Sequence, residues 1–90
     1  MASAKVGDLA VVDWIDSRGV SASWSMLDDV RNDGVCAMQS VGWIGKINKE
    51  MLLICPHVGD DPKQVCGEMH IPMVAITKIR VVEPATEEEQ

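Results

Sequence analysis

A long apolar run with two internal glycines constrains this chain more than any other feature of its 90 residues. Residues 35–47 read VCAMQSVGWIGKI, which has the length and apolar content of a strand. Glycine inside a strand marks a bulge or a tight bend, so Gly42 and Gly45 predict a strongly curved strand. The polar turn at residues 48–50 and the apolar segment 51–55 then predict a hairpin.

Further strands are predicted on both sides of this hairpin from short apolar runs rich in β-branched residues. The full set of predicted strands is 9–16, 35–47, 51–55, 65–71 and 77–82. Pro72 cannot donate a ladder hydrogen bond and therefore ends the fourth of them. Residues 73–76 predict a single 3₁₀ turn before the last strand, and residues 56–64 predict an exposed loop.

One short helix is predicted after a loop at residues 17–23. Ser25 is a suitable N-cap, and Asp28 stands three residues later as a shortened capping box. Gly34 is placed to end the helix in the left-handed conformation. A helix of about two turns does not form alone, so we expect it to dock on the sheet through its apolar side. Trp24, Leu27 and Val30 form that side.

Five short strands, one of them bent at glycines, favour a mainly β fold that curls to remove its free edges. We therefore expect a small five-stranded antiparallel barrel, SH3-like or Sm-like, with the short helix inserted after the first strand. The barrel is predicted to be one domain over residues 9–82. Residues 1–8 are expected to be a flexible N-terminus and residues 83–90 a disordered acidic tail.

The net charge of −6 is concentrated at one end of the chain. Four of the fourteen acidic residues lie at positions 83 and 87–89, and all eight basic residues precede Glu83. Residues 1–82 therefore carry ten acidic and eight basic side chains. Because no cluster of Lys and Arg is present to neutralise phosphates, the sequence argues against binding of duplex nucleic acid.

Neither a membrane segment nor a disulfide framework is indicated. The chain lacks a run of about 18 apolar residues, and its N-terminus lacks the apolar core of a signal peptide. The three cysteines are an odd number, which favours free thiols in a reducing compartment. We therefore expect a cytoplasmic protein.

Three strings in the second half of the chain carry a resemblance. They are Ser40-Val41-Gly42-Trp43-Ile44, Leu52-Leu53-Ile54-Cys55-Pro56 and Ile71-Pro72-Met73-Val74-Ala75-Ile76-Thr77-Lys78-Ile79. Similar strings occur in small uncharacterised proteins from tailed bacteriophages and prophages. This resemblance covers residues 35–82 and implies a phage-encoded protein of the host-cell cytoplasm, with no assigned activity.

The same segment more loosely resembles Sm-like proteins, in which a bent, glycine-bearing strand and a terminal pair of strands close the barrel. That resemblance implies assembly of rings or dimers through the edges of the sheet. This chain departs from the Sm-like pattern, since it has a strand and a predicted helix before the bent strand and lacks a basic RNA-binding loop.

Cysteine and histidine residues flank the predicted loop 56–64, and both are residue types that zinc prefers. Cys66 and His70 are four residues apart, about 13 Å along an extended strand, so they cannot both ligate one metal ion. Cys55, His57 and Cys66 remain an alternative to free thiols and a surface imidazole. With no phosphate-binding loop, dinucleotide fingerprint or nucleophile elbow, the sequence predicts neither an enzyme nor a cofactor.

Trp14, Trp24 and Trp43 are the only aromatic residues of the chain. A chain without Phe and Tyr could use all three in its core. Trp14 follows Asp13 on a strand, however, and Trp24 borders a polar loop, so either ring could line a pocket. The predicted binding residues are Trp14, Trp24, Trp43, Arg18 and Arg31.

The sequence therefore predicts a small non-enzymatic binding protein that forms homo-oligomers. We expect its partner to be a host or viral protein, contacted through the barrel edge and the helix. The alternative is an oligomer that encloses a small ligand at its subunit boundaries, such as a nucleotide signal that a phage gains by sequestering. The cationic groups available for that ligand are Arg18, Arg31, Lys46, Lys49 and Arg80.

Overall fold

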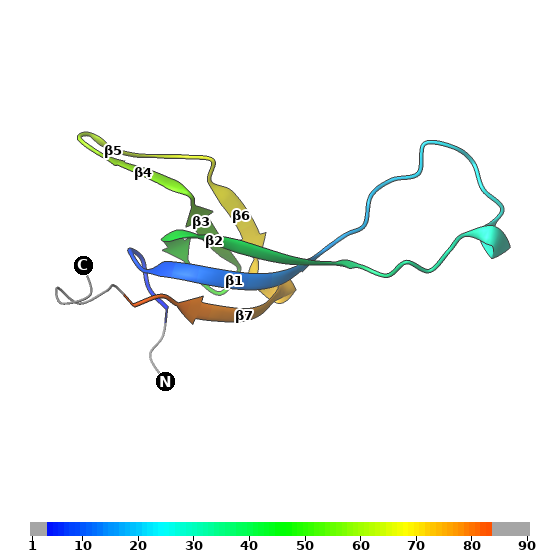
Figure 1. Cartoon of the computed structure of the whole chain (residues 1–90), viewed down its shortest axis with the longest axis horizontal. Helices are drawn as coiled ribbons and strands as arrows, with labels where there is room; N and C mark the ends of the chain where they lie inside the picture. Colours follow the sequence, from blue (N-terminus) through cyan, green and yellow to red (C-terminus); the bar gives the residue numbers. More distant parts are fainter. Residues whose placement is uncertain (1–3, 84–90) are drawn as a thin grey trace.

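The computed structural model describes residues 4–83, and Figure 1 shows their strands. The strands are β1 (Leu9–Asp16), β2 (Cys36–Ile47), β3 (Met51–Cys55), β4 (His57–Asp60), β5 (Lys63–Cys66), β6 (Met69–Pro72) and β7 (Ile76–Val81). Two 3₁₀ turns, η1 (Leu27–Asp29) and η2 (Met73–Ala75), complete the described elements. The mainly β class and the 3₁₀ turn before the last strand are thus confirmed.

An antiparallel sheet of five strands, in the order β6-β3-β2-β1-β7, carries the core on one of its faces. Alternate residues of β1, namely Ala10, Val12 and Trp14, are buried. They share a face with Ser40 and Ile44 of β2. The register pairs Val12 with Ser40, and every second side chain of a strand points to the same face of the sheet. The core cluster consists of Ala10, Val12, Trp14, Ile44, Leu52, Ile54 and Ile71.

The two glycines of β2 serve two different purposes, a bulge at Gly45 and a close approach of strands at Gly42. Gly45 is the extra residue of a β-bulge, since the pairing of β2 with β3 passes from Ile44 directly to Lys46 while β3 advances by one residue. At Gly42 the strands approach so closely that an added Cβ would lie 2.7 Å from the carbonyl oxygen of Cys55. Glycine is required there by space rather than by backbone dihedrals.

The closed barrel is not seen within residues 4–83, where β6 and β7 form the two edges of an open sheet. The predicted loop at 56–64 and strand at 65–71 also need correction. Most of the loop belongs to β4 and β5, which form a separate two-stranded hairpin around a turn at residues 61–62. Gly67, with φ of 76°, breaks the predicted fourth strand between β5 and β6.

The predicted helix is wrong, because η1 is a single 3₁₀ turn and no α-helix occurs among the described residues. Met26 precedes this turn without a side-chain cap hydrogen bond, and the backbone returns to an extended conformation at Val30. None of the η1 side chains is buried, so the packing that a two-turn helix needs is missing. Gly34 does adopt a positive φ of 74°, as predicted, but it ends no helix.

Residues 17–35 project from the sheet as an arm between β1 and β2 (Figure 1). The radius of gyration is 17.4 Å, whereas a compact chain of this length has about 12 Å. The longest dimension is 59 Å, against 31 and 29 Å for the other two. The arm therefore places about a fifth of the chain away from the core.

The chain on either side of the sheet is described only in part. Residues 5–8, expected to be flexible, form a turn in which the Gly7 amide donates to the Ile44 carbonyl oxygen and the Asp8 carbonyl accepts from the Ile44 amide. The predicted acidic tail lies outside the described residues except for Glu83. In the described chain no helix is long and apolar enough to cross a membrane.

Candidate functional site

The end of the arm presents apolar side chains directly to solvent. Trp24 and Leu27 are 102% and 85% exposed, and Met26 and Val30 are exposed as well. These four residues are called the apolar tip. Monomeric proteins rarely hold a contiguous set of such side chains in water unless they serve a binding surface.

Polar contacts hold the base of the arm in its extended shape. The guanidinium of Arg18 donates to the carbonyl oxygens of Gly34 and Val35, at 3.1 and 3.3 Å. Arg31 forms an ion pair with Asp33 at 3.3 Å. Both predicted cationic binding residues thus make contacts within the arm, and each guanidinium keeps further N–H donors free.

A second apolar feature lies between the sheet and the β4–β5 hairpin. It is a groove of about 450 Å³ lined mainly by Val6, Trp43, Cys55, Val58, Lys63 and Val65. Val58 and Val65 face each other across the hairpin. Both are partly exposed, as is Trp43, at 41%. This set is called the hairpin groove.

The three tryptophans occupy three different environments. Trp14 is buried in the core, and its indole Nε1 donates to the hydroxyl oxygen of Ser40 at 3.0 Å. The expectation that Trp14 lines a pocket is therefore corrected. Trp43 stands in the hairpin groove and Trp24 stands on the apolar tip, so the structure separates these two predicted binding residues instead of bringing them together.

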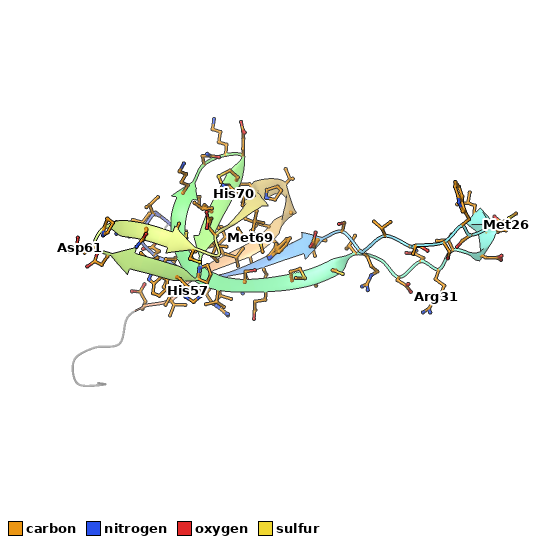
Figure 2. The ribbon with its side chains drawn as sticks, turned by 90° about the horizontal axis from the view of Figure 1, so that it is seen from above. Met26, Arg31, His57, Asp61, Met69 and His70 are labelled. Atoms are coloured by element: carbon orange, nitrogen blue, oxygen red, sulfur yellow. The ribbon has the colours of Figure 1, made fainter. Side chains whose placement is uncertain are left out.

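The arm and the hairpin groove lie at opposite ends of the molecule. In Figure 2, Met26 marks the arm at one end, and Asp61 marks the hairpin at the other. The β1–β2 ladder joins these ends, because Asp16 pairs with Cys36 where the arm begins and Leu9 pairs with Trp43 beside the groove. Seven residues of β1 separate the two pairs, which corresponds to about 23 Å.

The cysteine and histidine residues form no metal site in the described part of the chain. No group of three or more His, Cys, Asp or Glu side chains is placed there to hold an ion together. His57 and Cys66 are opposite each other on the hairpin, and Cys66 is exposed. Cys55 is buried at the floor of the groove, where burial and then the charge of Glu68 raise the pKa of its thiol.

Unpaired charges flank both apolar surfaces. Ion pairs within residues 4–83 join Lys5 to Asp8 and Arg31 to Asp33. Asp28 and Asp29, beside Leu27 on the apolar tip, have no ion-pair partner in that range, and neither does Lys63 of the groove. The tip therefore has a negative border, and the groove includes the positive Lys63, which the hairpin register places opposite Asp60.

Sequence reasoning missed Met26 as a surface residue and Val58, Lys63 and Val65 as groove residues. The signal for the groove was present but weak. Val58 and Val65 stand at equal distances from the Asp61-Pro62 pair, which is the spacing of facing residues in a hairpin with a two-residue turn. The sequence of the arm holds no comparable signal. The same apolar residues would be expected in a tip exposed to solvent and in a helix packed on the sheet.

The comparisons with known proteins add no name to this description. No protein-family model, no curated protein and no solved structure matches the chain.

Proposed function

We propose that this chain is a non-enzymatic accessory protein that binds a protein partner through its arm. The observation that carries the proposal is the exposure of Trp24, Met26, Leu27 and Val30 on a segment that extends away from the core. The open β sheet acts as the base that holds the arm out. The resemblance of residues 35–82 to phage proteins supports a phage-encoded chain with a host or viral partner.

The energetics of the tip support a protein partner. Burial of an aliphatic side chain contributes about 1.5–3 kcal/mol, and Trp offers a larger apolar surface together with an indole donor. Tryptophan is also enriched among the residues that dominate binding energy at protein interfaces. A partner that covers the tip gains this contribution, while the sheet keeps its own core unchanged.

Two finer points of the sequence prediction stay proposals. The strand order and the 3₁₀ turn before the last strand support the SH3-like or Sm-like barrel as the fold class. Sequestration of a nucleotide signal is the alternative function. Arg18 and Arg31 make contacts within the arm but keep N–H donors free for such a ligand.

The proposal is tested with a double variant of the tip, Trp24→Ser with Leu27→Ser, and with Val74→Ser as the matched control. Val74 is 97% exposed and lies outside the arm, in η2. Each tagged protein is used to capture partners from host lysate, and the captured protein is then purified and titrated against all three chains. We expect the tip variant to bind it at least tenfold more weakly than the control.

Circular dichroism and thermal unfolding establish that both variants keep the fold. Equal affinity of the partner for the tip variant and for the Val74→Ser control would show that the arm is not the binding element. A nucleotide that raises the thermal midpoint of the wild-type chain, with no protein captured, would favour the alternative instead.

A further inference from the structure

We infer that the hairpin groove of a second copy of this chain receives the apolar tip of the arm, which links copies head to tail. The inference rests on the proposed function and names the partner that the arm binds. It joins the two exposed apolar surfaces at opposite ends of the molecule.

The placement favours a second copy over the chain's own groove. The tip points away from the sheet, and the ladder of β1 and β2 separates the base of the arm from the groove by about 23 Å. The Arg18 hydrogen bonds to Gly34 and Val35 tie the two sides of the arm base together in this outward direction. A tip directed away from its own groove is presented to the groove of a neighbour.

The two surfaces match in apolar character. The tip supplies one indole and three flexible or branched aliphatic side chains, and the groove supplies Trp43, Val58, Val65 and Val6. The exposed tip side chains offer on the order of 400 Å² of apolar surface. This is about half of what one partner buries in a standard interface of about 800 Å² per side, so the rest of the arm must also contact the neighbour.

Charge bears on the orientation of the contact, and Asp60 stands opposite Lys63 in the hairpin. Asp28 and Asp29 border the tip and Lys63 lines the groove, and all three lack an ion-pair partner within residues 4–83. When Leu27 enters the groove, the two carboxylates that follow it come close to the Lys63 ammonium group. Attraction to Lys63 favours this orientation, and repulsion from Asp60 reduces the gain.

Because the tip and the groove are different surfaces, the contact is heterologous. A linked pair then still has one free tip and one free groove, so the assembly grows as a ring if the rotation closes and as a filament if it does not. A symmetric dimer, by contrast, would use the same patch on both copies. This difference makes the inference testable by mixing two variants.

The experiment mixes a tip variant (Trp24→Ser with Leu27→Ser) with a groove variant (Val58→Glu with Val65→Glu) and measures mass by sedimentation equilibrium. All four positions are at least partly exposed, and circular dichroism confirms that both variants fold. We expect the wild-type chain to form species above its 9.8 kDa mass and each variant alone to be monomeric. The mixture is expected to form a one-to-one complex, because the intact arm of the groove variant meets the intact groove of the tip variant.

A charge exchange gives a second measurement. Lys63→Glu is expected to weaken self-association at least tenfold, and addition of Asp28→Lys and Asp29→Lys to the same chain is expected to restore it. A wild-type chain that stays monomeric at about 200 µM overturns the inference, as does a mixture that forms no complex. If the purified partner protein still loses affinity for the tip variant, the proposed function stands and only the identity of the partner changes.

Discussion

The indole Nε1 of Trp14 on β1 donates a 3.0 Å hydrogen bond to the hydroxyl oxygen of Ser40 on β2. Both residues lie on the core face of the β1–β2 pair. Trp14 is the one tryptophan that is buried in the core. The bond satisfies the only polar group of that ring. Trp14 therefore serves the fold, whereas Trp24 and Trp43 are exposed.

Removal of the Ser40 hydroxyl is expected to destabilise the protein. Ser40→Ala leaves the part-buried indole N–H without its acceptor, which costs about 1–3 kcal/mol in the free energy of unfolding. Urea denaturation measures this cost. In a Trp14→Phe background the donor is absent, so the same substitution should cost less; an equal cost in both backgrounds would contradict the role assigned to the bond.

Gly42→Ala is expected to destabilise the sheet by about 1–3 kcal/mol, because the added methyl would lie 2.7 Å from the Cys55 carbonyl oxygen. Gly19→Ala is the matched control, since nothing lies within 4 Å of the corresponding position and its φ is not positive. The control should be neutral or stabilising by a few tenths of a kcal/mol up to about 1 kcal/mol. Chemical denaturation of both variants compares them, and similar losses would count against the close approach of β2 and β3.

Trp24→Ser is expected to change the free energy of unfolding by less than about 0.5 kcal/mol, because the ring has no packing to lose in the monomer. Denaturation is followed in dilute solution, where copies stay apart. A loss comparable to that of a core substitution would show that the arm packs on the sheet.

The Cys55 thiol should make stability depend on pH in the alkaline range. Burial and the Glu68 charge raise its pKa, so the folded protein holds this proton more tightly than the unfolded chain does. The contribution to stability is fully present below the ordinary thiol pKa of about 8.5 and is lost as pH rises through the folded-state value. Urea unfolding of the wild type and Cys55→Ala between about pH 7 and 10 isolates it, since the variant should lack this part of the decline.

The sequence predicted the features of the fold that depend on local chemistry. The bulge at Gly45 and the close approach at Gly42 follow from glycines inside an apolar strand, and Pro72 ends β6 as its missing N–H requires. The helix failed for a different reason. The spacing of Trp24, Leu27 and Val30 is that of the apolar side of a helix. Local sequence does not indicate, however, whether the sheet offers a surface against which that side can pack.

The hairpin groove was beyond sequence reasoning for a similar reason. Val58 and Val65 are single apolar residues in a polar segment, and they become a surface only when β4 pairs with β5. Trp43 of β2 lines the same groove, and the spacing of residues along the chain does not predict that it lies beside the hairpin. The sequence did single out Trp24 and Trp43, which the structure leaves exposed, because the chain has so few aromatic side chains.

Cross-linking of the tip to the groove tests the arm-in-groove contact most directly. One chain carries Leu27→Cys and the other carries Val65→Cys, both with Cys66→Ser to remove the exposed native thiol. We expect oxidation of the mixture to give a covalent dimer whose linked peptides contain residues 27 and 65, and a Val74→Cys chain in place of the Val65→Cys chain to give little. Equal yields from the Val65→Cys and Val74→Cys chains would contradict the account.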